Sequence, residues 1–165
     1  MTDRFAQYMP YLAPQRVRGQ ILISPAAAAP FGVPREVLLQ RRESAPYPER
    51  FGEILLSFIK VPPKPQLVDL YCATVAGTPR VALEGTMRMF NETSIVEQVQ
   101  QTRVPTLAIC PTADALISPA YVRQGILALI PGARLALLDC GHEAPIERPP
   151  QTAGLIEAFV GGLGG

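Results

Sequence analysis

Short apolar runs alternate with helical patterns along much of the chain, and prolines stand at most of the boundaries between them. Three runs are short enough to be single buried strands, and they lie at Val17 to Ser24, Val104 to Cys110 and Arg134 to Leu138. A helical pattern opened by Ser118-Pro119 separates the second run from the third, because Ser caps a helix and Pro suits its first position. Strand, helix and strand in alternation predict a parallel sheet with right-handed crossovers.

Two further helices are predicted before and after these strands. The pattern from Arg4 to Leu12 places apolar residues on one side of a helix, although Pro10 would kink or end it. The last helix, near the C-terminus, is expected to bury its apolar residues. The apolar side of the first helix consists of Phe5, Tyr8, Met9 and Leu12. The residues that the last helix is expected to bury are Leu155, Ile156 and Phe159.

Residues 27–101 show no strand pattern and contain short helical patterns separated by Pro and Gly. The predicted helices are Pro34 to Arg42, Glu49 to Lys60, Leu67 to Val75, Pro79 to Phe90, and a short one capped by Thr93 or Ser94. A run of helices between two strands of one sheet predicts a helical insertion. We therefore divide the chain into a core, residues 1–26 and 102–165, and a helical cap, residues 27–101.

Composition narrows the classes of function. The 165 residues are 48% hydrophobic and carry a formal net charge of +1 without a Lys/Arg run, so no nucleic-acid or membrane-surface partner is expected. No apolar run has the length of a membrane span, and Asp3 and Arg4 replace a signal-peptide segment, which predicts a cytoplasmic protein. Cys72, Cys110 and Cys140 accompany a single histidine, so we expect reduced thiols, no metal site and no cofactor.

The single histidine stands where open α/β sheets keep their chemistry. His142 follows the third predicted strand in a Gly-His step, and Asp114 lies in the loop after the second strand. Because the carboxyl ends of neighbouring parallel strands are close, the two side chains are expected to meet. A carboxylate on one imidazole nitrogen fixes the tautomer and leaves the other nitrogen free to take a proton from a nucleophile. The pair is two thirds of a charge-relay triad.

Four motifs in order resemble the C-terminal portion of the α/β-hydrolase-fold enzymes, in the cap-bearing group of esterases, non-haem haloperoxidases, lactonases and carbon–carbon hydrolases. The motifs are Pro14 to Pro25, Arg103 to Leu107 with Asp114 and Pro119, Ile130 to Leu135, and Gly141-His142 with Glu147-x-Pro149. The resemblance implies a partial α/β-hydrolase fold whose three parallel strands are family strands six to eight, with flanking helices and an inserted cap. It also implies that Asp114 is the triad acid and His142 the base.

The sequence departs from this family where the nucleophile should be. The family places it in a Gly-x-Ser-x-Gly elbow, and that elbow and the strands before it are absent. The resemblance puts Met1 directly after the nucleophile position, so its backbone N–H is a candidate oxyanion-hole donor. We therefore expect the chain to be inactive or nearly so by itself, and coding sequence upstream to encode a Gly-x-Ser just before Met1.

Several other residues have a structural and a functional interpretation. Tyr71, Met87 and Phe90 are candidates for an apolar substrate pocket, although packing explains such a stripe more simply. Glu143 and Glu147 are expected to be solvated or helix-terminal charges. Other residues are assigned to structure, with Cys140 as a core thiol and Ser24 as a strand-end hydrogen-bonding residue.

The leading hypothesis is hydrolysis of a small apolar ester, lactone or related acyl substrate by a nucleophile, His142 and Asp114. An Asp nucleophile, as in dehalogenases and epoxide hydrolases of this fold, is the mechanistic rival. The second hypothesis is an inactive remnant that acts as an interaction module. In either case the strand at Ile21 to Ser24 presents an unpaired edge, which favours self-association or a complementary N-terminal half.

Overall fold

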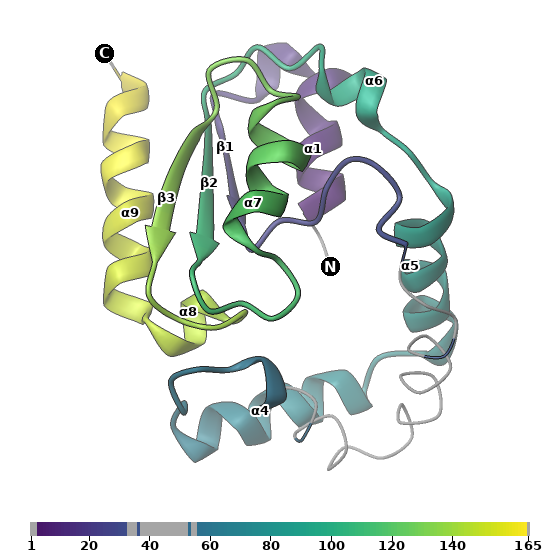
Figure 1. Ribbon diagram of the computed structural model, residues 1–165, viewed down its shortest axis with the longest axis vertical. Coiled ribbons are helices and arrows are strands. Elements are labelled where there is room, and N and C mark those ends of the chain that lie inside the picture. The colour runs from purple at the N-terminus through teal and green to yellow at the C-terminus, as the bar shows by residue number, and fades with distance from the viewer. Residues whose placement is uncertain (1–2, 33–35, 37–52, 54–55, 165) are drawn as a thin grey trace.

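A parallel three-stranded sheet lies at the centre of the protein. The computed structural model describes residues 3–32, 36, 53 and 56–164. The strands are β1 (Gln20–Ile23), β2 (Thr106–Pro111) and β3 (Arg134–Leu138), in the order β1-β2-β3 (Figure 1). Both pairs are parallel, with Leu22 opposite Ala108 and Ile109 opposite Ala136. The predicted parallel sheet is confirmed, and β1 is shorter than the apolar run from Val17 to Ser24 that predicted it.

Helices cover both faces of this sheet. Helix α9 (Pro149–Gly161) lies on one face, and α1 (Asp3–Leu12) and α7 (Pro119–Val122) lie on the other (Figure 1). Successive residues of a strand point to opposite faces, so Leu107 and Ile109 pack with Phe159 of α9, while Ala108 and Cys110 pack on the α7 side. The central strand is buried throughout, which explains its continuous apolar sequence.

The helix predicted after Ser118 forms as expected. The Ser118 hydroxyl accepts a hydrogen bond of 3.1 Å from the Tyr121 N–H, and Pro119 takes the first helical position. After α7 the chain continues as a π-helical turn over Arg123–Leu127. Along α7, this turn and the residues after it, the side chains of Val122, Ile126 and Ile130 are fully buried. These residues belong to the same buried cluster as Ala108 and Cys110, so this segment packs against β2.

Helix α1 turns a polar side toward the protein. Its buried residues are Arg4, Gln7 and Pro10, and the helix continues through Pro10 to Leu12. Its apolar side faces outward in the described part of the chain, with Phe5, Met9 and Leu12 exposed by 62%, 48% and 60%. The polar side is buried because main-chain carbonyl groups of residues 26–29 accept hydrogen bonds from it.

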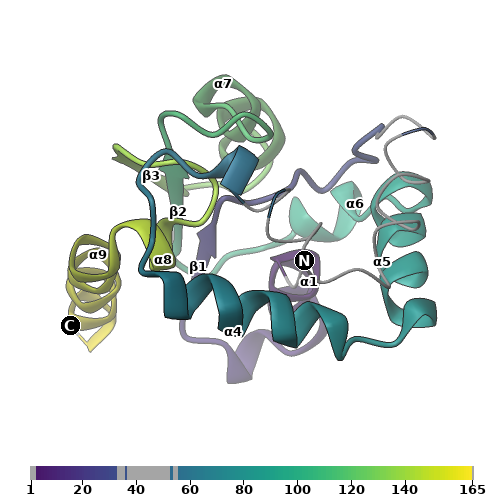
Figure 2. The same cartoon turned by 90° about the horizontal axis from the view of Figure 1, so that it is seen from below.

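Between β1 and β2 the chain forms the helices of the inserted region. They are α4 (Pro65–Ala76), α5 (Arg80–Glu92) and α6 (Val96–Val99). Figures 1 and 2 show α4 lying across the carboxyl ends of the strands. The helix predicted at Pro34 to Arg42 and most of the one at Glu49 to Lys60 lie outside the described residues, and the cap role of residues 27–101 stays a prediction. None of the described helices has the length and apolar character needed to cross a bilayer.

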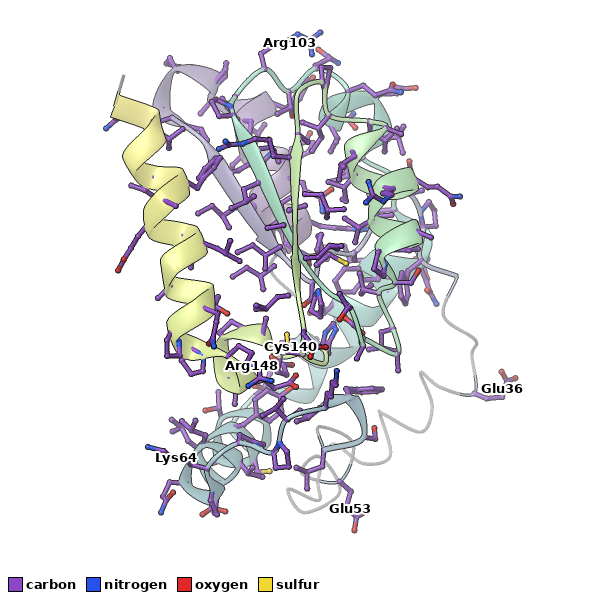
Figure 3. All side chains as sticks on the ribbon, turned by 60° about the vertical axis from the view of Figure 1, so that its left-hand side comes forward. Glu36, Glu53, Lys64, Arg103, Cys140 and Arg148 are labelled. Atoms are coloured by element: carbon purple, nitrogen blue, oxygen red, sulfur yellow. The ribbon has the colours of Figure 1, made fainter. Side chains whose placement is uncertain are left out.

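The remaining short elements complete the core. They are the 3₁₀ turns Pro14–Arg16 and Gly162–Gly164 and the helix α8 (Ala144–Glu147). Helix α8 directly follows residues 139–143, the histidine loop, and leads into α9. At the carboxyl ends of the strands, Cys140 and Arg148 lie on the side of the inserted region that carries Lys64. Arg103 lies at the opposite end of the sheet (Figure 3).

Candidate active site

Asp114 and His142 form a hydrogen-bonded pair at the carboxyl ends of β2 and β3. The imidazole Nδ1 of His142 lies 2.7 Å from Oδ2 of Asp114. The Asp114 side chain is completely buried, and the His142 side chain is 25% exposed. The acid is therefore shielded from water, while the imidazole retains access to solvent on another side.

The second oxygen of Asp114 is held by its own loop. Oδ1 accepts hydrogen bonds of 2.7 Å from the Leu116 N–H and 3.0 Å from the Ile117 N–H. An Asp side chain that binds backbone two and three residues ahead closes a tight turn, so the carboxylate orientation is set locally. Oδ2 is left to accept a hydrogen bond from Nδ1–H of His142, and the lone pair of the base is then on Nε2. The tautomer follows from this geometry.

The backbone of His142 is fixed on two further sides. Its N–H donates to the carbonyl oxygen of Phe58 over 2.8 Å, and its carbonyl oxygen accepts a bond of 2.7 Å from the Ser24 hydroxyl. The ring of Phe58 packs edge-on against the imidazole with centroids 6.3 Å apart. The histidine is thus positioned by β1, by the inserted region and by Asp114.

A cavity of about 290 Å³ opens beside the imidazole along the free edge of β1. Its wall consists of Asp3, Ala6, Ile21, Leu22, Ile23, Ser24, His142, Glu143 and Pro145. Among the described residues, no strand pairs with this edge of β1 and no side chain forms a hydrogen bond with Nε2 of His142. The Ser24 hydroxyl binds the main chain of His142 and thus matches its predicted strand-end role.

Of the other predicted site residues, the structure describes Phe90 and Tyr71. Phe90 is buried in α5 with the Arg4 guanidinium 5.3 Å from its ring centre, and it is not part of the cavity wall. Tyr71 lies in α4 and is half-buried. Met87 lies in α5, but its side chain is outside the described part, as is the whole of Met1. Their assignments to a pocket and an oxyanion hole stay predictions.

Glu147 is not a solvated charge, which is one of the two roles expected for it, the other being a helix-terminal charge. Its side chain sits at the end of α8 and the residue is only 6% exposed. Its carboxylate accepts hydrogen bonds from four backbone N–H groups, which belong to Lys60, Val61, Gly141 and Glu143. Sequence reasoning missed this role because two of the donors lie more than eighty positions away, beyond any local pattern.

The surroundings of the Cys140 thiol, which precedes the Gly-His step, make it unreactive. Cys140 is fully buried, and burial, together with the nearby Glu147 carboxylate, raises the pKa of its thiol to about 11. A thiol is nucleophilic only as the thiolate, so Cys140 does not serve as a nucleophile for His142 near neutral pH. Within the part of the chain that the structure describes, no three His, Cys, Asp or Glu side chains gather as metal ligands.

Comparison with known proteins identifies the fold. The sequence matches no protein-family model and no curated protein. Solved structures do match: a hydrolase from Pseudomonas aeruginosa PA01 has a TM-score of 0.75 at 24% identity, and an enol-lactonase from Burkholderia xenovorans LB400 has 0.76 at 19%. A bromoperoxidase from Bacillus anthracis has a TM-score of 0.78 at 14% identity.

The extent of these matches is as informative as their quality. Each covers 94% of this chain but only 60%, 60% and 62% of the three longer chains. The chain therefore spans about 60% of the length of the structures that it matches. Identities below 25% establish a shared fold and nothing beyond it.

Proposed function

Because this chain has the fold of the C-terminal portion of an α/β-hydrolase, we propose that it is the acid- and base-bearing part of a hydrolase for small, fairly apolar esters, lactones or related acyl compounds. The observation that supports this most strongly is the 2.7 Å hydrogen bond between Nδ1 of His142 and the buried Asp114. The enol-lactonase among the similar structures favours an acyl substrate.

The proposed mechanism assigns one task to each side chain. Nε2 of His142 takes the proton of a nucleophilic hydroxyl as the oxygen attacks the substrate carbonyl carbon, and Asp114 stabilises the imidazolium. His142 then returns the proton to the departing alkoxide, which leaves an acyl-enzyme. Water, deprotonated by the same nitrogen, releases the acid and regenerates the hydroxyl. Asp114 orients the ring and stabilises its imidazolium form throughout, and no step transfers a proton to it.

The nucleophile in this proposal belongs to the part of the fold that the chain does not span. The cavity along β1 is the position next to which a further strand and its elbow would bring a hydroxyl to His142. The backbone N–H of Met1 is proposed as one oxyanion donor. A nucleophilic Asp is the alternative, in which case His142 activates the water that hydrolyses the ester intermediate.

A second candidate function, an interaction module without catalysis, is favoured by the outer surface of α1. Phe5, Met9 and Leu12 form an exposed apolar row on α1, and within the described residues no strand pairs with the outer edge of β1. Such surfaces mark protein contacts. The proposed occupant is a complementary N-terminal half or a second copy of the chain.

An ester assay separates the two candidates. Hydrolysis of p-nitrophenyl acetate and butyrate is measured for the 165-residue chain and for a form lengthened by whatever coding sequence precedes it. The hydrolase proposal expects background rates for the short chain and turnover for the lengthened one. Absence of turnover in the lengthened form, or the lack of any Gly-x-Ser or Asp elbow in it, contradicts the proposal and favours the interaction module.

A fluorophosphonate probe then distinguishes the nucleophiles. Such a probe phosphonylates an activated Ser and releases fluoride, whereas a carboxylate nucleophile does not form a stable adduct. Labelling of the lengthened form, lost on replacement of its elbow Ser, supports the Ser mechanism. Turnover without labelling supports the Asp mechanism.

A further inference from the structure

The Glu147 carboxylate joins two segments that are distant in the chain. Its Oε2 accepts hydrogen bonds of 2.8 Å from the Gly141 N–H, 2.9 Å from the Lys60 N–H and 2.8 Å from the Val61 N–H. Its Oε1 accepts one of 3.1 Å from the Glu143 N–H. Two donors thus belong to the histidine loop and two to the inserted region, so one buried side chain binds both.

The two segments also touch directly. The His142 N–H donates to the Phe58 carbonyl oxygen over 2.8 Å. Gly141 allows this approach because a Cβ there would lie 2.7 Å from the Lys60 nitrogen and closer still to the Phe58 carbonyl oxygen. Segment 58–61 therefore lies against the main chain of the histidine loop with no side chain between them.

From this arrangement we propose that Glu147 is a positioning residue, which binds segment 58–61 to the histidine loop. The inserted region and His142 are thereby held in place together, so that displacing the segment also displaces the imidazole. Buried N–H groups need hydrogen-bond acceptors, and the Glu147 carboxylate is the acceptor for four of them. Water does not replace it because the site is buried. Release of segment 58–61 would break the hydrogen bond that the His142 N–H donates to the Phe58 carbonyl oxygen. The role in catalysis rests on the proposed function of His142.

An exposed ion pair crosses the same junction and provides the contrast. Lys60 Nζ contacts the Asp139 carboxylate, but the two side chains are 45% and 69% exposed. Solvent screens such a pair, so its contribution is small. The buried Glu147 carboxylate is therefore responsible for holding the segment.

Amide hydrogen exchange on the 165-residue chain tests this directly, without substrate. The variants are Glu147→Gln, which replaces one acceptor oxygen by an NH₂ group, and the matched control Asp139→Asn. We expect Lys60, Val61 and Gly141 amides to exchange at least about tenfold faster in Glu147→Gln and nearly unchanged in Asp139→Asn. The β2 amides of Leu107 and Ile109 report the global fold and should stay protected in both.

The NMR signal of the His142 ring proton tests whether the contact between segment 58–61 and the histidine loop affects the Asp114–His142 pair. His142 is the only histidine, so its ring signals need no assignment. The low-field Nδ1 proton, protected by Asp114, should be sharp in the wild type and in Asp139→Asn, and broadened or lost in Glu147→Gln. Unchanged exchange and an unchanged ring proton in Glu147→Gln would overturn the proposal, as would equal effects of Asp139→Asn.

A second variant covers the case in which Glu147→Gln loses its fold. Gly141→Ala keeps the Glu147 side chain chemically unchanged, but its Cβ would lie 2.9 Å from Glu147 Oε1 and closer still to segment 58–61, so it forces the segment and the carboxylate apart from the histidine loop. It should raise exchange at Lys60 and Val61 selectively, and protected amides there would contradict the proposal. Because these readouts need no turnover, a failed ester assay refutes the hydrolase function and leaves the positioning role standing.

Discussion

The Ser24 hydroxyl donates a hydrogen bond of 2.7 Å to the carbonyl oxygen of His142, which joins residues 118 positions apart. Ser24 has a positive φ of 47°, so the end of β1 bends to bring its side chain under the histidine loop. The hydroxyl therefore supports the main chain of His142 and is engaged away from the imidazole Nε2.

Ser24→Ala tests whether this serine is structural. The variant should keep its fold and lose about 1 kcal/mol of stability, the usual contribution of one hydrogen bond, as measured by urea denaturation. In a lengthened form that turns over, the rate should fall modestly because the loop loosens. A loss as complete as that of His142→Ala would instead identify Ser24 as a relocated nucleophile.

Asp114→Asn should reverse the tautomer of His142. The Asn oxygen can still accept from Leu116 and Ile117, but its NH₂ group then faces Nδ1 and forces the ring proton onto Nε2. Imidazole ¹⁵N shifts of the single histidine report this change. In a lengthened active form we expect kcat to fall at least about 1,000-fold with stability nearly retained. Unchanged ring nitrogen shifts would contradict the assignment of Asp114.

Arg4→Met should destabilise the chain through the carbonyl groups that it leaves without a donor. Arg4 is 2% exposed and donates to main-chain oxygens of Ala27, Met89 and Thr93, among others. We expect a loss of about 3 kcal/mol by urea denaturation, because buried carbonyl groups lose their partners. Arg16→Met, at an exposed position, is the matched control and should change stability by less than about 0.5 kcal/mol. Equal effects of the two variants would refute the anchoring role.

The buried thiols should resist alkylation. Burial raises the pKa of Cys110 and Cys140 to about 11. At pH 8 their thiolate fraction is then about 100-fold lower than at an ordinary pKa of 9.0, so iodoacetamide should modify partly exposed Cys72 first. Peptide mass spectrometry checks the order, and rapid modification of Cys140 in the folded chain would contradict it.

The same two thiols predict a loss of stability at alkaline pH. Below about pH 9 they are protonated in both states and contribute no pH dependence. Between about pH 9 and 11 the unfolded chain releases their protons while the folded chain keeps them, so the free energy of unfolding should fall. Urea midpoints at pH 8 and pH 10 test the sign, and a higher midpoint at pH 10 would contradict it.

The sheet and the dyad could be predicted because their signals are local. Prolines bound the three apolar runs, and alternation with helices requires a parallel sheet whose carboxyl ends meet. That geometry alone brings Asp114 and His142 together, and the structure shows their hydrogen bond. No contact beyond neighbouring strands was needed for the inference.

The roles that were missed depend on partners far away in the chain. Glu147 has the sequence context of a surface charge, and two of the four N–H groups that make its burial favourable belong to Lys60 and Val61, 87 and 86 positions away. The polar side of α1 is buried for a similar reason, since loop carbonyl groups receive Arg4 and Gln7. Hydrophobic periodicity does not report where a distant backbone group will find its partner.

The central claim is that His142 acts as the base of a hydrolase, and kcat/KM for p-nitrophenyl butyrate in the lengthened form tests it most directly. The account predicts that His142→Ala lowers this value at least about 1,000-fold while β2 amide protection is unchanged. Turnover that is the same with and without the imidazole would contradict it.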